Sequence, residues 1–217
     1  MNQILWTPTQ DQIEASQMDA FRKQINARYN LSLNNYHELH QWSVTHITDF
    51  WKAIWGFMSI EFSSDYTQVV DDETKMPGAK WFEGAQFNFA ENLLRIRSDK
   101  PAIQFKGEGQ PVRTLSYIEL FSEVENLASA LRKMGVQKGD RVVGFMPNMP
   151  ETIIAMLATT SIGAIWSSSS PDFGIKGVLD RFTQIEPKVL FAADGYFYNG
   201  KPFDSLQKLK SILVELP

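Results

Sequence analysis

Apolar residues recur at helical spacing in the first part of the chain. Thr9 and Gln12 form the capping-box pattern that commonly starts a helix, because each side chain can bond to a free backbone N–H group. The positions that follow, at steps of four residues, are Ile13, Gln17, Phe21 and Ile25. This spacing predicts helical structure within residues 9–30.

A second helical stretch is predicted over residues 36–58, where apolar and aromatic residues are dense. The side chains that we expect to pack in a core are Trp42, Phe50, Trp51, Ile54 and Trp55. Residues 69–95 show little regular period before residues 90–95. We therefore expect a long ordered loop that ends in a short helix.

The pattern changes near Arg97, after which short apolar runs alternate with helical ones. This change predicts a tryptophan-rich, mainly helical N-terminal cap over residues 1–97 and an incomplete α/β domain over residues 98–217. Two short runs open the second part, at residues 101–107 and 112–117, and they predict a β-hairpin.

The clearest helix of the chain is predicted over residues 116–135. Ser116 and Glu119 form a capping box at its start, and Gly135 stands where a left-handed helix end favours glycine. One apolar face is marked at steps of three and four residues by Tyr117, Leu120, Val124, Leu127, Leu131 and Met134.

Strands and helices then alternate with a regular period. The segments in order are a strand at 141–147, a helix at 150–163, a strand at 164–169, a helix at 173–187 and a strand at 188–194. The strands start at Arg141, Ala164 and Lys188, which are 23 and 24 residues apart. This βα period predicts a mostly parallel sheet with right-handed crossovers, and we expect about four or five strands in the layer.

Composition narrows the function classes. The chain has no cysteine, which excludes disulfides, thiolate metal sites and a cysteine nucleophile. Its net charge of -4 argues against a nucleic-acid-binding protein. The first twelve residues have no basic region or long apolar core, and no stretch approaches the about 18 apolar residues that span a bilayer. We therefore expect a cytoplasmic protein without membrane or nucleic-acid partners.

Common catalytic and metal motifs do not fit. His37 and His40 are one residue too close for the H-E-x-x-H zinc pattern, so no metal site is predicted. Neither a dinucleotide-binding glycine loop nor a Walker loop follows any predicted strand. The serines at 167–170 lack the flanking glycines of an esterase elbow, and no histidine follows them in the chain. We predict no catalytic residue and interpret the run as a strand end, with Asp172 as N-cap of the next helix.

Three longer stretches carry a resemblance to a known family. They are Trp81–Arg95, Gly139–Gly174 and Pro187–Lys201. Together they resemble the acyl-CoA synthetase, or adenylate-forming, superfamily, and within it the branch that activates acetoacetate. The resemblance covers essentially the whole chain in order. A cysteine of the family pattern is replaced here by Ser169.

The resemblance implies a two-step reaction in the full-length parent. ATP and Mg²⁺ first convert the acid to an acyl-adenylate and pyrophosphate, and the thiol of coenzyme A (CoA) then displaces AMP. Members of the family are considerably longer, and their phosphate loop and catalytic lysine lie beyond the matched region. We therefore expect the chain to be an N-terminal fragment that binds no ATP, CoA or Mg²⁺ alone and that can self-associate through surface left exposed.

The resemblance also points to a candidate cofactor site. The family's loop that approaches the nucleotide end of CoA falls on Ser170, Pro171 and Asp172, and its arginine pair falls on Tyr198 and Lys201. Only Lys201 keeps the positive charge. Two alternatives remain open at this stage. One is an acetyl- or propionyl-type ligase of the same superfamily, and the other is a non-catalytic α/β binding module.

Overall fold

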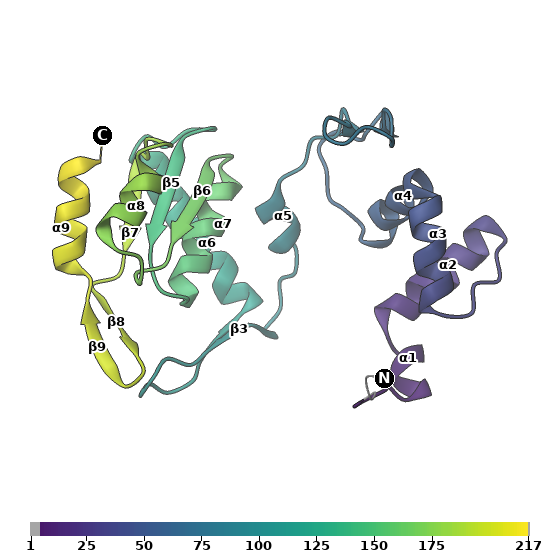
Figure 1. The fold of residues 1–217 in the computed structure, drawn as a ribbon, viewed down its shortest axis with the longest axis horizontal. Coiled ribbons are helices and arrows are strands. Elements are labelled where there is room, and N and C mark those ends of the chain that lie inside the picture. The colour runs from purple at the N-terminus through teal and green to yellow at the C-terminus, as the bar shows by residue number, and fades with distance from the viewer. Residues whose placement is uncertain (1–4, 217) are drawn as a thin grey trace. The chain divides into compact units, whose positions relative to one another are not determined.

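The computed structural model describes residues 5–216, so the first four residues, on which the leader prediction partly rests, lie outside it. The chain forms two compact units, residues 1–87 and 88–217 (Figure 1). Each unit has its own hydrophobic core. The domain boundary near Arg97 stays a prediction.

The first unit begins with four helices, and both predicted helical stretches are interrupted. The helices are α1 (Gln10–Glu14), α2 (Gln17–Tyr29), α3 (Tyr36–Thr45) and α4 (Ile47–Phe57). The Thr9 capping box is confirmed, but the first stretch breaks at Ser16, whose side chain accepts the Asp19 N–H as a new N-cap. The second stretch breaks at His46, which has non-helical backbone angles. At Ser16 a polar cap therefore overrides an apolar period that continues across it, whereas His46 makes no side-chain capping bond.

The irregular loop predicted at residues 69–95 contains a small antiparallel pair of strands. The pair consists of β1 (Gln68–Val70) and β2 (Trp81–Glu83), and the predicted short helix is α5 (Phe89–Leu93) in the second unit. Trp55 of α4 stacks on Phe82 with ring centroids 4.8 Å apart, which ties the pair to the helices. Trp42 is buried as predicted, whereas Trp51 is 41% exposed and does not belong to the core.

The second unit contains the predicted parallel sheet. Its strands are β5 (Arg141–Phe145), β6 (Ile165–Ser169) and β7 (Val189–Ala192), in the order β6-β5-β7. The helices are α6 (Tyr117–Lys133), α7 (Pro150–Ser161), α8 (Ile175–Phe182) and α9 (Leu206–Glu215). The parallel βα arrangement is confirmed, as are the Ser116 capping box and the left-handed Gly135, with φ +83°.

Two hydrophobic cores lie on opposite faces of this sheet. Val142 packs in one core with side chains of α6 and α7, which include Leu131 and Leu157. Its neighbour Val143 packs in the other with Val178 of α8 and Ile212 of α9. Successive residues of a strand point to opposite faces, so the two helix pairs cover the two faces (Figure 1).

The sheet has three strands in the described chain, fewer than expected. The predicted hairpin, β3 (Pro101–Phe105) with β4 (Arg113–Ser116), forms a separate antiparallel sheet. A second hairpin, β8 (Gly195–Tyr198) with β9 (Lys201–Asp204), was not predicted. Within residues 5–216, β6 and β7 are the outer strands of the parallel sheet. Self-association through such surfaces stays a prediction. No helix in this range is long and apolar enough to cross a membrane.

A close contact inside the sheet requires glycine at position 144. A Cβ atom placed there would lie 2.7 Å from two ring carbons of Trp166 on the neighbouring strand. We expect Gly144→Ala to lower the free energy of unfolding by about 1–3 kcal/mol, since the indole must move within a packed core. Chemical denaturation followed by tryptophan fluorescence and circular dichroism measures this change.

The matched control is Gly177→Ala in α8. A Cβ at this position meets its nearest neighbouring atom, a ring carbon of Phe173, at an ordinary contact distance of 3.6 Å. Alanine favours a helix over glycine by about 1 kcal/mol, so the control should leave stability unchanged or raise it. Equal destabilisation by both substitutions would contradict the role given to the Trp166 contact.

Candidate functional site

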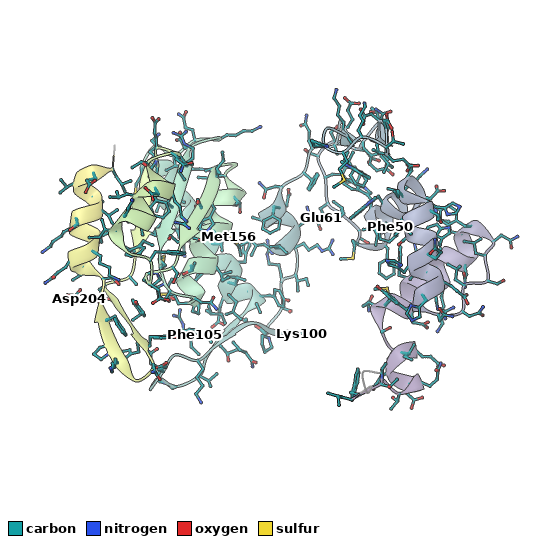
Figure 2. The ribbon with its side chains drawn as sticks, viewed as in Figure 1. Phe50, Glu61, Lys100, Phe105, Met156 and Asp204 are labelled. Atoms are coloured by element: carbon teal, nitrogen blue, oxygen red, sulfur yellow. The ribbon has the colours of Figure 1, made fainter. Side chains whose placement is uncertain are left out.

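A cleft of about 830 Å³ lies beside the carboxyl ends of the parallel strands. The segment after β5 contributes Pro147 to Met149, the segment after β6 contributes Ser170 to Asp172, and the segment after β7 contributes Asp194. The rest of the lining comes from the β8–β9 hairpin, the end of β3, the loop that follows β3 and Leu206 of α9, and two of these residues, Phe105 and Asp204, are labelled in Figure 2. Ligands of open α/β sheets bind at this edge, because the loops there are free to vary.

Aromatic side chains form much of the cleft lining. Tyr196 and Phe203 face each other across the β8–β9 hairpin, with ring centroids 5.2 Å apart and an interplanar angle of 13°. Three further aromatic residues line the cleft: Phe105, Phe197 and Tyr198. Phe197 and Tyr198 are more than half exposed. Such rings offer flat faces on which a planar ligand can stack.

Hydrogen bonds hold the segment Ser170 to Asp172 in place. The Tyr196 hydroxyl donates to Oδ1 of Asp172 at 2.7 Å, and the Ser170 hydroxyl donates to Oδ2 at 3.1 Å. The Lys208 ammonium group donates to the carbonyl oxygen of Pro171 at 3.1 Å. The loop after β6 is therefore tied to both β8 and α9.

The prediction that Asp172 caps the next helix is wrong. The N-cap of α8 is Gly174, which makes no side-chain capping bond, and the helix begins at Ile175. Asp172 lies two residues too early to reach the free N–H groups of α8, and its carboxylate accepts from Tyr196 instead. Its role in this structure is to connect two elements of the cleft.

The surroundings of Tyr196 keep its phenol protonated. Partial burial, followed by the hydrogen bond to Asp172 and the negative charge of that carboxylate, raises the pKa of Tyr196 to about 12. The phenol therefore remains a donor to Asp172 throughout the physiological pH range. The bond between the loop and the hairpin does not depend on pH there.

The lining is mainly acidic. Its charged residues are one lysine, Lys106, and four carboxylates, those of Glu108, Asp172, Asp194 and Asp204. The structure brings together the predicted residues Ser170, Pro171 and Asp172, but Lys201 is absent from the lining. Lys201 is exposed at the start of β9, where it pairs with Tyr198.

The sequence analysis did not predict the aromatic rings of the cleft as site residues. It also did not predict Glu108 or Asp194. The dipeptide Asn199-Gly200 between two aromatic runs is a hairpin signal, and it would have revealed β8 and β9. Glu108 and Asp194 carry no such local signal. The only three histidines of the chain are His37, His40 and His46, all in the first unit, so the cleft contains none for a serine hydrolase triad.

Comparison with known proteins supports the same family. The family model described as "AMP-binding enzyme" matches residues 90–216, and that described as "Acetyl-coenzyme A synthetase N-terminus" matches residues 36–93. An acetoacetyl-CoA synthetase of Macaca fascicularis is 46% identical over 99% of this chain. A malonamoyl-CoA synthetase of Penicillium aethiopicum is 38% identical over 99% of it.

A solved structure shows the same fold. The acetoacetyl-CoA synthetase of Streptomyces lividans covers 100% of this chain with a TM-score of 0.93 and 40% sequence identity. The chain spans about a third of these proteins: 32% of the macaque relative, 30% of the Penicillium relative and 34% of the solved chain. The family match over more than half of the chain, together with this fold, shows that the chain belongs to the AMP-binding enzyme family.

Proposed function

We propose that these 217 residues are the N-terminal portion of an ATP-dependent acid–thiol ligase. The complete enzyme would convert acetoacetate, ATP and CoA to acetoacetyl-CoA, AMP and pyrophosphate through an acyl-adenylate, in the cytoplasm. Relatives named acetoacetyl-CoA synthetase support the acyl substrate. The observation that carries the role of this portion is the aromatic cleft beside the carboxyl ends of the strands.

The cleft fits the nucleotide end of CoA in size and in surface. Its volume of about 830 Å³ lies within the range of small-molecule sites. The exposed ring of Tyr198, on the same hairpin face as Tyr196, suits the adenine base, because stacking on an aromatic ring needs no particular hydrogen-bond pattern. Bound CoA would supply the thiol that accepts the acyl group. The loop Ser170 to Asp172 would contact the bound nucleotide without reacting.

The charges in and beside the cleft indicate different places for the base and for the 3′-phosphate of CoA. The four carboxylates of the lining disfavour a phosphate inside the cleft. Lys201 is exposed next to the hairpin turn, and its ammonium group can meet the 3′-phosphate of CoA as a point charge. We therefore assign Ser170, Pro171 and Asp172 to the base and sugar, and Lys201 to the phosphate.

We assign neither ATP nor Mg²⁺ to the cleft. No group of three or more histidine or acidic side chains between residues 5 and 216 is arranged to hold a metal ion. We therefore assign no Mg²⁺ ligand here, and we propose that activation of the acid depends on other parts of the complete enzyme. Another short-chain acid is the alternative substrate, because one relative is named malonamoyl-CoA synthetase.

The 217-residue chain alone should not form an acyl-adenylate. This step needs preorganised positive charge around the phosphates of ATP, and the cleft described here is mainly acidic. With acetoacetate, Mg²⁺ and labelled pyrophosphate, the purified chain should exchange label into ATP only at the background rate. An exchange rate equal to that of the complete enzyme would refute this assignment.

Lys201→Glu in the complete enzyme should raise the KM for CoA severalfold, since it replaces an attraction for phosphate by repulsion. Exchange between ATP and pyrophosphate should stay near normal, because CoA takes no part in that half-reaction. Steady-state kinetics with varied CoA, together with the exchange assay, measure the two effects.

Ser170→Ala serves as the comparison within the same site. It removes the hydroxyl that bonds to Asp172 and leaves the bond from Tyr196 in place. We expect normal adenylate formation, because Ser170 has no nucleophilic role. Loss of the first half-reaction in this variant, or unchanged CoA kinetics in Lys201→Glu, would count against the proposed site.

A further inference from the structure

The turn of the β8–β9 hairpin is held by a carboxylate from a distant part of the chain. Oε1 of Glu108 accepts the backbone N–H of Asn199 at 2.9 Å, and Oε2 accepts that of Gly200 at 2.7 Å. Glu108 lies in the loop that joins β3 to β4, which Figure 1 places beside the tip of the β8–β9 hairpin. One side chain thus receives both N–H groups of the turn.

The geometry of the turn explains why both of its N–H groups bond to one carboxylate. Asn199 and Gly200 both have positive φ angles, 51° and 72°, as the central residues of a tight hairpin turn do. Their two N–H groups reach the two oxygens of a single carboxylate. Hydrogen bonds from N–H groups to an ionised carboxylate are stronger than neutral ones.

The hairpin needs such an anchor because it has little packing of its own. A two-stranded hairpin alone is at best marginally stable in water. All four residues of β9, Lys201 to Asp204, are exposed. At the other end of the hairpin, Tyr196 bonds to Asp172 and the Ser205 N–H bonds to the carbonyl oxygen of Asp194. Glu108 therefore holds the tip, while these bonds hold the base.

We propose that Glu108 is a positioning residue for CoA. It acts through the hairpin turn that it holds, and its carboxylate does not bind CoA directly. By fixing the Asn199–Gly200 turn, it holds the adjacent Tyr198 in the cleft lining and the exposed Lys201 beside the cleft. This inference rests on the proposed function. A direct electrostatic role would act in the opposite direction, since a carboxylate near a phosphate weakens its binding.

Kinetics of the complete enzyme test whether removal of Glu108 raises or lowers the KM for CoA. Glu108→Ala should raise the KM for CoA about fivefold, because loss of the two bonds frees the hairpin. Exchange between ATP and pyrophosphate should remain normal. Glu108→Gln retains one acceptor oxygen and should give an intermediate rise. The control is Glu125→Ala, which removes an exposed carboxylate from α6 and should change neither value.

Amide hydrogen exchange of the complete enzyme without ligand provides a readout independent of activity. The amides of Asn199 and Gly200 should exchange at least about tenfold faster in Glu108→Ala, whereas amides of β5 keep their protection. Unchanged exchange at the turn would overturn the inference. A lower KM for CoA in both Glu108 variants would also overturn it, because it would show that only the charge matters.

Lys201→Glu distinguishes failure of this inference from failure of the proposed function. If Lys201→Glu raises the KM for CoA and Glu108→Ala does not, the positioning role is wrong and the CoA site stands. If neither variant changes the KM for CoA, the proposed site itself is wrong, and the inference is overturned with it.

Discussion

The second unit depends on the alternation of side chains along its central strand. Val142 points into the core formed with α6 and α7, and Val143 points into the core formed with α8 and α9. Both are fully buried. Because one strand contributes to both cores, the two helix layers are both packed against the same sheet. Since the strands are parallel, the loops that follow them emerge at one edge of the sheet. The cleft lies where these loops meet.

Polar bonds between distant segments also shape the cleft. The hydroxyl of Tyr196, the ammonium group of Lys208 and the carboxylate of Glu108 each connect segments that lie far apart in sequence. Such bonds fix the backbone while leaving the aromatic faces of Phe197 and Tyr198 uncovered. A rigid frame with exposed rings is suited to bind a planar ligand without large rearrangement.

The sequence predicted the elements whose signals are local and strong. The capping box at Ser116, the left-handed Gly135 and the βα period were all confirmed, because each depends on residues close to one another in the chain. The breaks at Ser16 and His46 were missed, since the apolar period continues across both. The resemblance singled out Ser170 to Asp172, which line the cleft, but the bond from Tyr196 spans 24 residues and leaves no pattern in the sequence. Contacts of this kind depend on the tertiary fold.

The contact between Gly144 and Trp166 links two positions on neighbouring strands. The indole occupies the space in which any other residue at 144 would place its Cβ atom. The two positions should therefore covary among related chains, with a small residue at one wherever the other is large. In directed evolution, a side chain at 144 costs less stability after residue 166 has become smaller, so the order in which the two substitutions arise decides how stable the intermediate variant is.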